Sequence, residues 1–137
     1  MLRTWLALSL LFATLALVPA GAHLAALPHK IALPAGAYFV IQQIYAGWAL
    51  FGIAVFGALI VIGALAVTLR RRRLPNTAAA VAWLCIAGTQ VLFWMFTQPA
   101  NAVTANWTVV PAAWLQLRAQ WEWSHAASAV LNLAALV

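Results

Sequence analysis

The chain has 137 residues, of which 67% are hydrophobic and 6% are charged, and its formal net charge is +6. A soluble domain has about 45–50% apolar and about 25% charged residues, so this composition excludes a water-soluble globular protein. Because a membrane-spanning helix needs about 20 residues, residues 1–137 have room for one all-α membrane domain and none for a separate soluble domain.

Four apolar segments are each long enough to cross a bilayer as a helix. They are separated by prolines or polar runs: Pro28 and Pro34, then "RRRRLPN", then "QPAN" and Pro111. The second segment is the longest, so its first residues form a re-entrant or interfacial turn, or its helix tilts. The sequence therefore predicts a four-transmembrane-helix bundle with spans over residues 4–27, 37–69, 77–97 and 112–137.

The first span also fits a secretory signal peptide. Arg3 would be its basic start, and Ala20-Gly21-Ala22 would be a small-residue cleavage site after an apolar core. We expect the segment to remain in the protein as the first helix of the bundle.

The cations predict the orientation of the helices. Arg3 and the run Arg70 to Arg73 fall on one side of the predicted membrane, Lys30 falls on the other, and Arg118 lies within the fourth span. The positive-inside rule then places both termini in the cytoplasm, and we expect a bacterial inner membrane protein. The net charge does not indicate nucleic acid binding, because the excess lies in one short loop against a membrane, where anionic lipid headgroups are the expected partners.

Cys85 is the only cysteine, in the middle of the third span. Four-helix quinone-linked thiol oxidoreductases need Cys-x-x-Cys pairs, so the sequence excludes that class of enzyme.

The fourth span contains Glu122, the only carboxylate side chain of the protein. At 100° per residue Arg118, Glu122 and His125 lie on one face of a helix, together with Trp114 and Trp121. Charged groups at hydrocarbon depth must face the bundle interior and pair there. The spacing predicts an ion pair between Arg118 and Glu122 at i and i+4, with His125 in reach of Glu122 at i+3.

The other spans supply polar or aromatic side chains to the same outer half of the bundle, whereas the inner half is apolar or small. We expect these side chains to line one site with the fourth helix. They are His23, Gln42, Tyr45, Gln90, Trp94 and Asn101.

Three chemistries could use these groups. A di-iron site is excluded because it needs further carboxylates. A mononuclear metal could be held by Glu122, His125 and His23, with His29 as a further donor, but Arg118 would then lie beside the cation. Axial haem ligation by His23 and His125 fits by residue type, although the two residues differ in expected depth by about 12 Å at 1.5 Å per residue.

The metal-free alternative has no cofactor. His125 would act as general base, and the Arg118 guanidinium would stabilise an enolate-like or phenolate-like oxyanion. Trp114, Trp121 and Trp94 would form the walls for a flat aromatic ligand.

The stretch "TQPANAVTANWTVVPAAWLQLRAQWEWSHAASAVLNLAA" resembles the closing segment of the anthrone oxygenase-like family of small integral membrane proteins. The residues that carry the resemblance include an Asn after a Thr-x-Pro turn and Trp, Arg, Trp-Glu and His on the last helix. The earlier "GAHLAALPHKIALPAGAYFVIQQIYAGWALFG" is similar to the first hairpin of bacterial members. The matching positions of the closing segment are Asn101, Pro111, Trp114, Arg118, Trp121, Glu122 and His125.

The resemblance implies a four-helix membrane protein and, from fungal relatives, cofactor-free oxidation of an anthrone to an anthraquinone by dioxygen. Most bacterial relatives have no assigned activity. The catalytic roles given above for His125, Arg118 and Glu122 come from helix geometry and not from the resemblance.

A second hypothesis belongs to another functional class. The polar groups could hold the bundle together in an accessory subunit of a larger membrane complex, in a homo-oligomer, or in a binder of a lipid, pigment or quinone without turnover. A closed and fully paired cluster would favour this hypothesis, whereas an open pocket that reaches His125 would favour a catalytic site.

Overall fold

The computed structural model describes all residues from 1 to 137, and it contains helices and no strand. Four long helices form the body of the molecule, and shorter ones join them. The helices are α1 (Leu2–Lys30), α2 (Ala35–Gln42), α3 (Gly52–Arg71), α4 (Thr77–Leu92), α5 (Gln98–Val103) and α6 (Trp114–Leu136). Two 3-10 turns, η1 (Gln43–Tyr45) and η2 (Trp48–Phe51), and the π-helical segment η3 (Phe93–Thr97) complete the chain.

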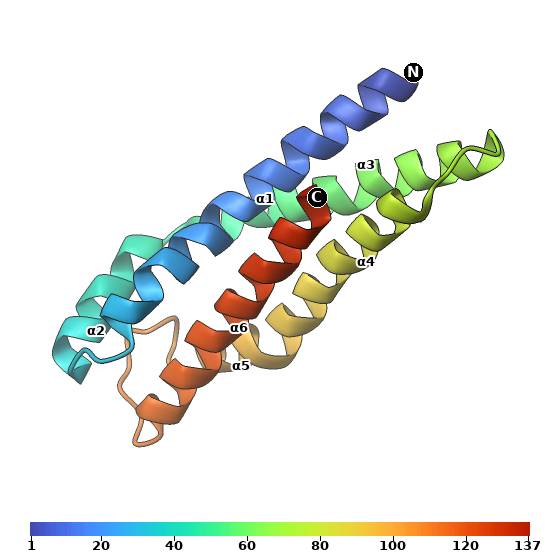
Figure 1. The fold of residues 1–137 in the computed structure, drawn as a ribbon. Helices are drawn as coiled ribbons and strands as arrows, with labels where there is room; N and C mark the ends of the chain where they lie inside the picture. Colours follow the sequence, from blue (N-terminus) through green and yellow to red (C-terminus); the bar gives the residue numbers. More distant parts are fainter.

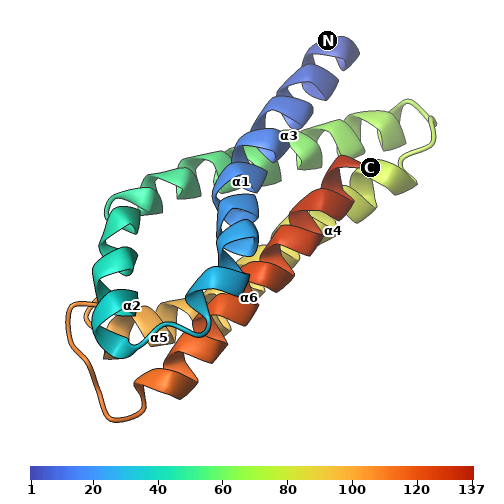
Figure 2. The ribbon, with the colours of Figure 1, turned by 60° about the vertical axis from the view of Figure 1, so that its left-hand side comes forward.

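The four long helices lie side by side, and each contacts two of the others (Figure 1). Helix α1 packs against α3 and α6, and α4 packs against the same two helices from the opposite side. Both chain termini and the α3–α4 turn lie toward one end, which we call the terminal end (Figures 1 and 2). Helices α2 and α5 lie at the other end, which we call the loop end.

Three helical segments are long and apolar enough to cross a membrane. They are Leu2–Lys30, Trp48–Arg71 and Thr77–Val103. The outward faces of these segments carry large apolar side chains: Ile53 is 70% exposed and Leu84 is 63% exposed. Such surfaces are unfavourable in water and suit a lipid environment.

The interior of the bundle is built mainly from small and branched side chains. Ala13, Ala58 and Ile86 are buried together between α1, α3 and α4. Gly57 lets α3 approach α1 closely, because a Cβ atom at this position would overlap the ring of Phe12. A second cluster of larger side chains at the loop end contains Tyr38, Phe39, Ala100, Trp107 and Trp121.

Three predicted boundaries were wrong. Helix α1 does not end near Leu27 but continues through Pro28 to Lys30. The second predicted span is divided, because the chain turns at Gly47, whose φ of 84° lies in the left-handed region that glycine adopts without strain, and α3 begins only afterwards.

The third helix does not end at the "QPAN" motif. It continues through the π-helical segment η3 and Pro99 to Val103. Pro99 has no backbone N–H and its ring crowds the preceding turn, so a locally widened helix accommodates it without a break. Only the fourth span, now α6, has bounds close to those predicted.

Candidate functional site

The carboxylate of Glu122 lies in the interior at the loop-end half of the bundle. Its residue is 1% exposed. Oε1 lies 3.0 Å from Nζ of Lys30 on α1, and the two side chains are 4% exposed for Lys30 and 0% exposed for Glu122. The hydroxyl of Tyr38 on α2 donates a hydrogen bond to the same oxygen at 2.9 Å. Glu122 therefore joins α1, α2 and α6 through one oxygen atom.

Lys30 reaches this position because α1 does not stop at Pro28. In a helix, residues seven positions apart lie on nearly the same face, so His23 and Lys30 both face α6. The sequence predicts Lys30 only as a cation that orients the helices, whereas the structure buries it beside Glu122. The scarcity of charge could have indicated the pairing of Lys30. Glu122 is the only acid of the protein, and Lys30 and Arg118 are the only Lys or Arg residues in its half of the bundle, so few ion pairs are possible.

Arg118 does not pair with Glu122. Its Nη1 donates instead to the backbone carbonyl of Leu33 at 2.7 Å, between α1 and α2. The guanidinium carbon lies 4.8 Å from the ring centroid of Trp114 and 5.5 Å from that of Tyr38. The predicted ion pair between Arg118 and Glu122 was therefore wrong, although their i to i+4 spacing permits it. Lys30 already neutralises Glu122, and Arg118 instead satisfies the Leu33 carbonyl, which has no hydrogen-bond partner within a helix.

His125 stacks on His23 of α1. The ring centroids are 4.1 Å apart with an angle of 28° between the planes. The indole of Trp121 lies against both rings, with centroids 4.8 Å from His23 and 4.2 Å from His125. The predicted depth difference of about 12 Å between His23 and His125, at 1.5 Å per residue, was wrong. It assumed that the first helix ends near Leu27, whereas α1 continues to Lys30 and His23 lies farther from its end.

Aromatic rings surround the histidine pair and the ammonium group. Tyr45 lies 4.3 Å from His23 between ring centroids, and Trp48 lies 5.5 Å from it. The Nζ atom of Lys30 lies 4.7 Å from the ring centroid of Tyr45 and 5.0 Å from that of Trp121. These ring faces add cation–π attraction to the ion pair with Glu122.

Tyr38 stands outside the three membrane-length helices, on α2. Gln42, one turn later, donates a hydrogen bond to its hydroxyl oxygen. Burial and the neighbouring Glu122 carboxylate raise the pKa of the Tyr38 phenol far above its usual value. Tyr38 therefore remains a hydrogen-bond donor to Glu122 at every physiological pH.

Asn101 on α5 supports the aromatic side chains from the loop end. Its Oδ1 accepts hydrogen bonds from Nε1 of Trp121 at 2.8 Å and from Nε1 of Trp107 at 3.1 Å. The Trp107 carbonyl in turn accepts from Gln43 at 2.9 Å. Asn101 thus fixes two indoles beside the ion pair.

The loop that carries Trp107 has an unusual backbone. Ala105, Asn106 and Trp107 have φ values of 47°, 55° and 65°. Consecutive non-glycine residues in the left-handed region are strained and are found mainly at functional sites. The buried Trp107 side chain holds this loop over Tyr38 and Trp121, with centroid distances of 5.2 Å and 5.7 Å.

Most of the side chains predicted for the site come together here, and two do not. Trp94 is 61% exposed on the outside of η3, where it contacts Phe93. Gln90 is on α4 and makes no side-chain hydrogen bond. The predicted use of Trp94 as a wall for a ligand was therefore wrong, because the wider π-helical turn changes the face on which it lies. The structure brings together His23, Gln42, Tyr45, Asn101, Trp114, Arg118, Trp121, Glu122 and His125, and adds Lys30, Tyr38, Trp48 and Trp107.

Unpartnered polar atoms are concentrated in this cluster. Eight buried side-chain nitrogen or oxygen atoms have no hydrogen-bond partner, and six of them are here: Nδ1 of His23, Nζ of Lys30, Oε1 of Gln42, Nε of Arg118, Oε2 of Glu122 and Nε2 of His125. The Lys30 ammonium is close to Glu122 but makes no well-angled hydrogen bond. Buried polar atoms in folded proteins are normally satisfied, so such a group of free donors and acceptors is typical of a binding or reaction site.

The donor set does not fit the metal sites considered from the sequence. No group of three His, Cys, Asp or Glu side chains is close enough to hold a metal ion. The histidine rings stack face to face with centroids 4.1 Å apart, whereas two axial imidazoles on one haem iron hold their centroids about 6 Å apart at metal–nitrogen bonds of about 2 Å.

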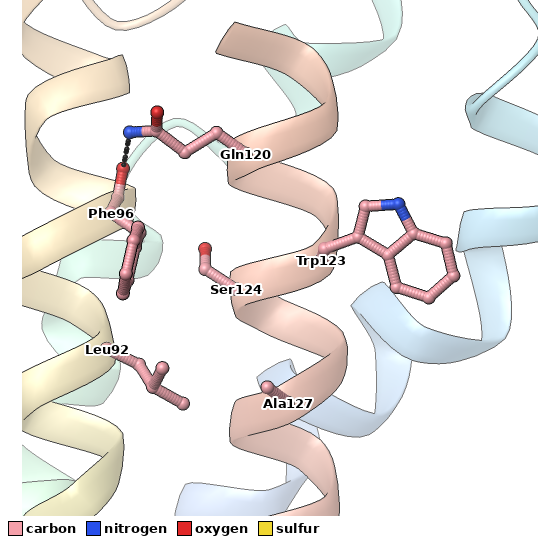
Figure 3. A pocket seen from close by; sticks show the side chains of 6 residues that line it. All are labelled: Leu92, Phe96, Gln120, Trp123, Ser124 and Ala127. Carbon is pink, nitrogen blue, oxygen red and sulfur yellow. Dashed lines mark hydrogen bonds between the residues drawn. The ribbon is translucent and has the colours of Figure 1, made fainter. Parts of the chain in front are cut away.

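A shallow pocket of about 370 Å³ lies on another flank of α6, between that helix and the α4–η3 segment. Figure 3 shows Leu92 and Phe96 facing Ser124, with the Trp123 indole directed to the other flank of α6. The side-chain amide of Gln120 on α6 donates a hydrogen bond of 2.8 Å to the backbone carbonyl of Phe96 in η3 (Figure 3). Neither His125 nor Glu122 lines this pocket, so it is not an open pocket that reaches His125.

Comparisons of the chain with models of protein families, with curated proteins and with solved structures found no match.

Proposed function

We propose that the protein is an integral membrane protein with four spans, in which α6 is the fourth. At 23 residues α6 is about 34 Å long, enough for a bilayer core. Its polar Glu122 and Asn132 are buried, whereas Trp123, Val130 and Leu133 are 61%, 59% and 47% exposed. Arg3 and the Arg run lie at the terminal end, which is then cytoplasmic in a bacterial inner membrane.

We propose that the polar cluster binds a planar lipophilic aromatic compound and oxidises it with dioxygen without a cofactor, as the resemblance to anthrone oxygenases implies. The observation that carries this proposal is the concentration of six unpartnered buried polar atoms around stacked His23 and His125. Aromatic faces beside free donors suit a flat ligand with a carbonyl or phenol oxygen.

The reaction needs a base and a cation. An anthrone loses one proton from the carbon opposite its carbonyl, and the electron pair that remains reduces dioxygen. A carbon–oxygen bond forms at that carbon, and the proton returns to the outer oxygen, which gives a hydroperoxide. Loss of the second hydrogen from the same carbon and cleavage of the oxygen–oxygen bond release one water molecule and leave the quinone, so one anthrone and one dioxygen give one anthraquinone and one water.

His125 is the base in this proposal, since its Nε2 is buried and has no partner. Lys30 replaces Arg118 as the cation that stabilises the oxyanion, because its ammonium is beside the ring faces and keeps free donors. Glu122 holds the Lys30 ammonium in place through the contact between Oε1 and Nζ. Arg118 is a positioning residue, since it binds the Leu33 carbonyl.

Substrate entry requires movement of the side chains that close the cluster. The loop of Ala105 to Trp107 is the proposed entrance, because its backbone is strained and its indole covers Tyr38 and Trp121. The entrance would then be at the loop end of the bundle.

A second candidate function is structural, in an accessory subunit or a binder without turnover. It is favoured by the burial of the Lys30–Glu122 pair, whose side chains are 4% and 0% exposed. It leaves the six unpartnered atoms unexplained, because polar groups that serve only to join helices gain by pairing fully.

Dioxygen uptake by purified protein with anthrone tests the proposal. We expect uptake equal to anthraquinone formed, in the presence of a chelator, and a loss of about 100-fold or more in rate for His125→Phe. The control is His29→Phe, which makes the same substitution at an exposed histidine and should keep full activity. If the wild type shows no rate above the protein-free reaction, while anthraquinone still quenches its tryptophan fluorescence, the protein is a binder; if it shows neither, the structural function is correct.

A further inference from the structure

A groove of about 580 Å³ lies at the terminal end, apart from the polar cluster. It is lined by residues of α1, α3, α4 and α6, and 14 of its 16 lining residues are hydrophobic. Leu69 and Thr77 are among them, and these two residues flank the α3–α4 turn on either side. The groove thus adjoins the turn that carries Arg70 to Arg73.

The four arginines form no salt bridge within the protein. All four are exposed, and Glu122, the only acid, is at the other half of the bundle in its pair with Lys30. Their counter-charge must therefore come from outside the chain. At a membrane surface such exposed cations are attracted to anionic lipid headgroups.

Arg73 occupies a position where a glycine is usual. Its φ is 57°, its N–H bonds the Arg70 carbonyl at 3.0 Å, and the N–H of Leu74 bonds the Leu69 carbonyl at 3.0 Å. This is the pattern of a helix end closed by a left-handed residue, which costs a residue with a Cβ atom more than it costs glycine. A strained arginine here indicates that the fourth charge has a use of its own.

The groove also contains a polar group without a partner. Ser9 lines it and is 5% exposed, and its hydroxyl has no hydrogen-bond partner. A purely apolar occupant would leave this hydroxyl unsatisfied. An occupant with an apolar chain and ester oxygens would satisfy both the apolar walls and Ser9.

We propose that the groove binds one anionic phospholipid, with an acyl chain between α1, α3, α4 and α6 and its phosphate at Arg70 to Arg73. Charge complementarity selects the headgroup, since a second copy of this basic chain would bring its own arginines to the same place. The inference rests on the proposed membrane insertion and is independent of the chemistry at the polar cluster.

Native mass spectrometry of the intact protein with equal amounts of phosphatidylglycerol and phosphatidylcholine of the same chains tests this. The wild type should retain one phosphatidylglycerol molecule in preference to phosphatidylcholine. Replacing all four arginines by glutamine should lower the retained ratio to the mixing ratio, whereas Arg3→Gln, at the same end, should keep the preference. Equal retention of both lipids by the wild type, or an unchanged preference without the four arginines, would overturn the proposal.

A second variant keeps the arginines and so avoids any change of topology. Ala82→Leu fills the groove, and Ala7→Leu adds the same group at an exposed position of α1 that does not line it. We expect Ala82→Leu to lose the retained lipid and Ala7→Leu to keep it. Retention by both variants would mean that the arginines attract lipid without a groove site, and it would contradict the proposal.

Discussion

At the scale of single residues, Asn101 has the clearest structural role. One oxygen atom accepts both indole N–H groups of Trp107 and Trp121, which are each 4% exposed. Asn101→Ala leaves two buried donors unpaired, at about 1–3 kcal/mol for an unsatisfied group. We expect a loss of at least about 2 kcal/mol in the free energy of unfolding, measured by denaturant titration in detergent micelles.

The exposed Asn106, in the same loop, provides the control. Asn106→Ala should change the stability by about 0.5 kcal/mol or less, as surface substitutions do. Equal effects of the two substitutions would show that the indole hydrogen bonds contribute nothing.

The sequence identifies some of these residues better than others. Glu122, His125 and Arg118 could be placed in the interior because charge is costly in a membrane and they share one face of a helix. Their partners could not be predicted, because helical spacing within α6 says nothing of α1. Lys30 reaches Glu122 only because α1 continues through Pro28, and Tyr38 only because α2 turns back toward α6.

At the scale of the helices, the contact between α1 and α3 depends on Gly57. A Cβ atom there would lie 2.4 Å from Cδ1 of Phe12. Gly57→Ala must therefore move the ring or separate the helices, and we expect it to cost about 1–3 kcal/mol in thermal or denaturant unfolding.

Gly52 on the same helix is the matched control, since no atom lies within 4 Å of a Cβ atom added there. Gly52→Ala should stabilise the protein by about 0.4–1 kcal/mol, because alanine loses less backbone freedom on folding. A neutral Gly57→Ala would contradict the close approach of α1 and α3.

The strained loop gives a prediction of opposite sign. Ala105 has a φ of 47°, which glycine adopts without steric cost. We expect Ala105→Gly to stabilise the protein by about 0.5 kcal/mol, after the larger chain entropy of glycine is subtracted. Ala112→Gly, in the same loop and without a positive φ, should destabilise it, and the same sign for both variants would show that the loop holds no strain.

The sequence predicted that the long helices exist. It did not predict where the first and third helices end or where α3 begins. Apolar length was sufficient for the long helices. Pro28 and Pro99 looked like breaks, but the helix tolerates Pro28 near its end, and the π-helical η3 accommodates Pro99. The division of the second predicted span depends on the conformation of Gly47, which a run of apolar residues does not reveal.

At the scale of the whole molecule, the polar cluster around Glu122 and the run Arg70 to Arg73 lie toward opposite ends of the bundle. The proposed topology puts the α3–α4 turn in the cytoplasm and the Trp107 loop outside. In a Cys85→Ser background, a membrane-impermeant maleimide should label Asn106→Cys in intact cells and Leu74→Cys only after lysis. The reverse pattern, or labelling of both positions in intact cells, is incompatible with this topology.

The central claim is that Glu122 on α6 is neutralised by Lys30 of α1, and not by Arg118 of its own helix, and that this pair holds α1 to α6. A double-mutant cycle of unfolding free energies with Lys30→Met and Glu122→Gln tests it most directly. Lys30→Met alone leaves a buried charge unpaired and should cost about 3–5 kcal/mol, most of which Glu122→Gln should restore. Arg118→Met and Glu122→Gln should be additive within about 0.5 kcal/mol, and strong coupling of Glu122 to Arg118 with none to Lys30 would contradict the account.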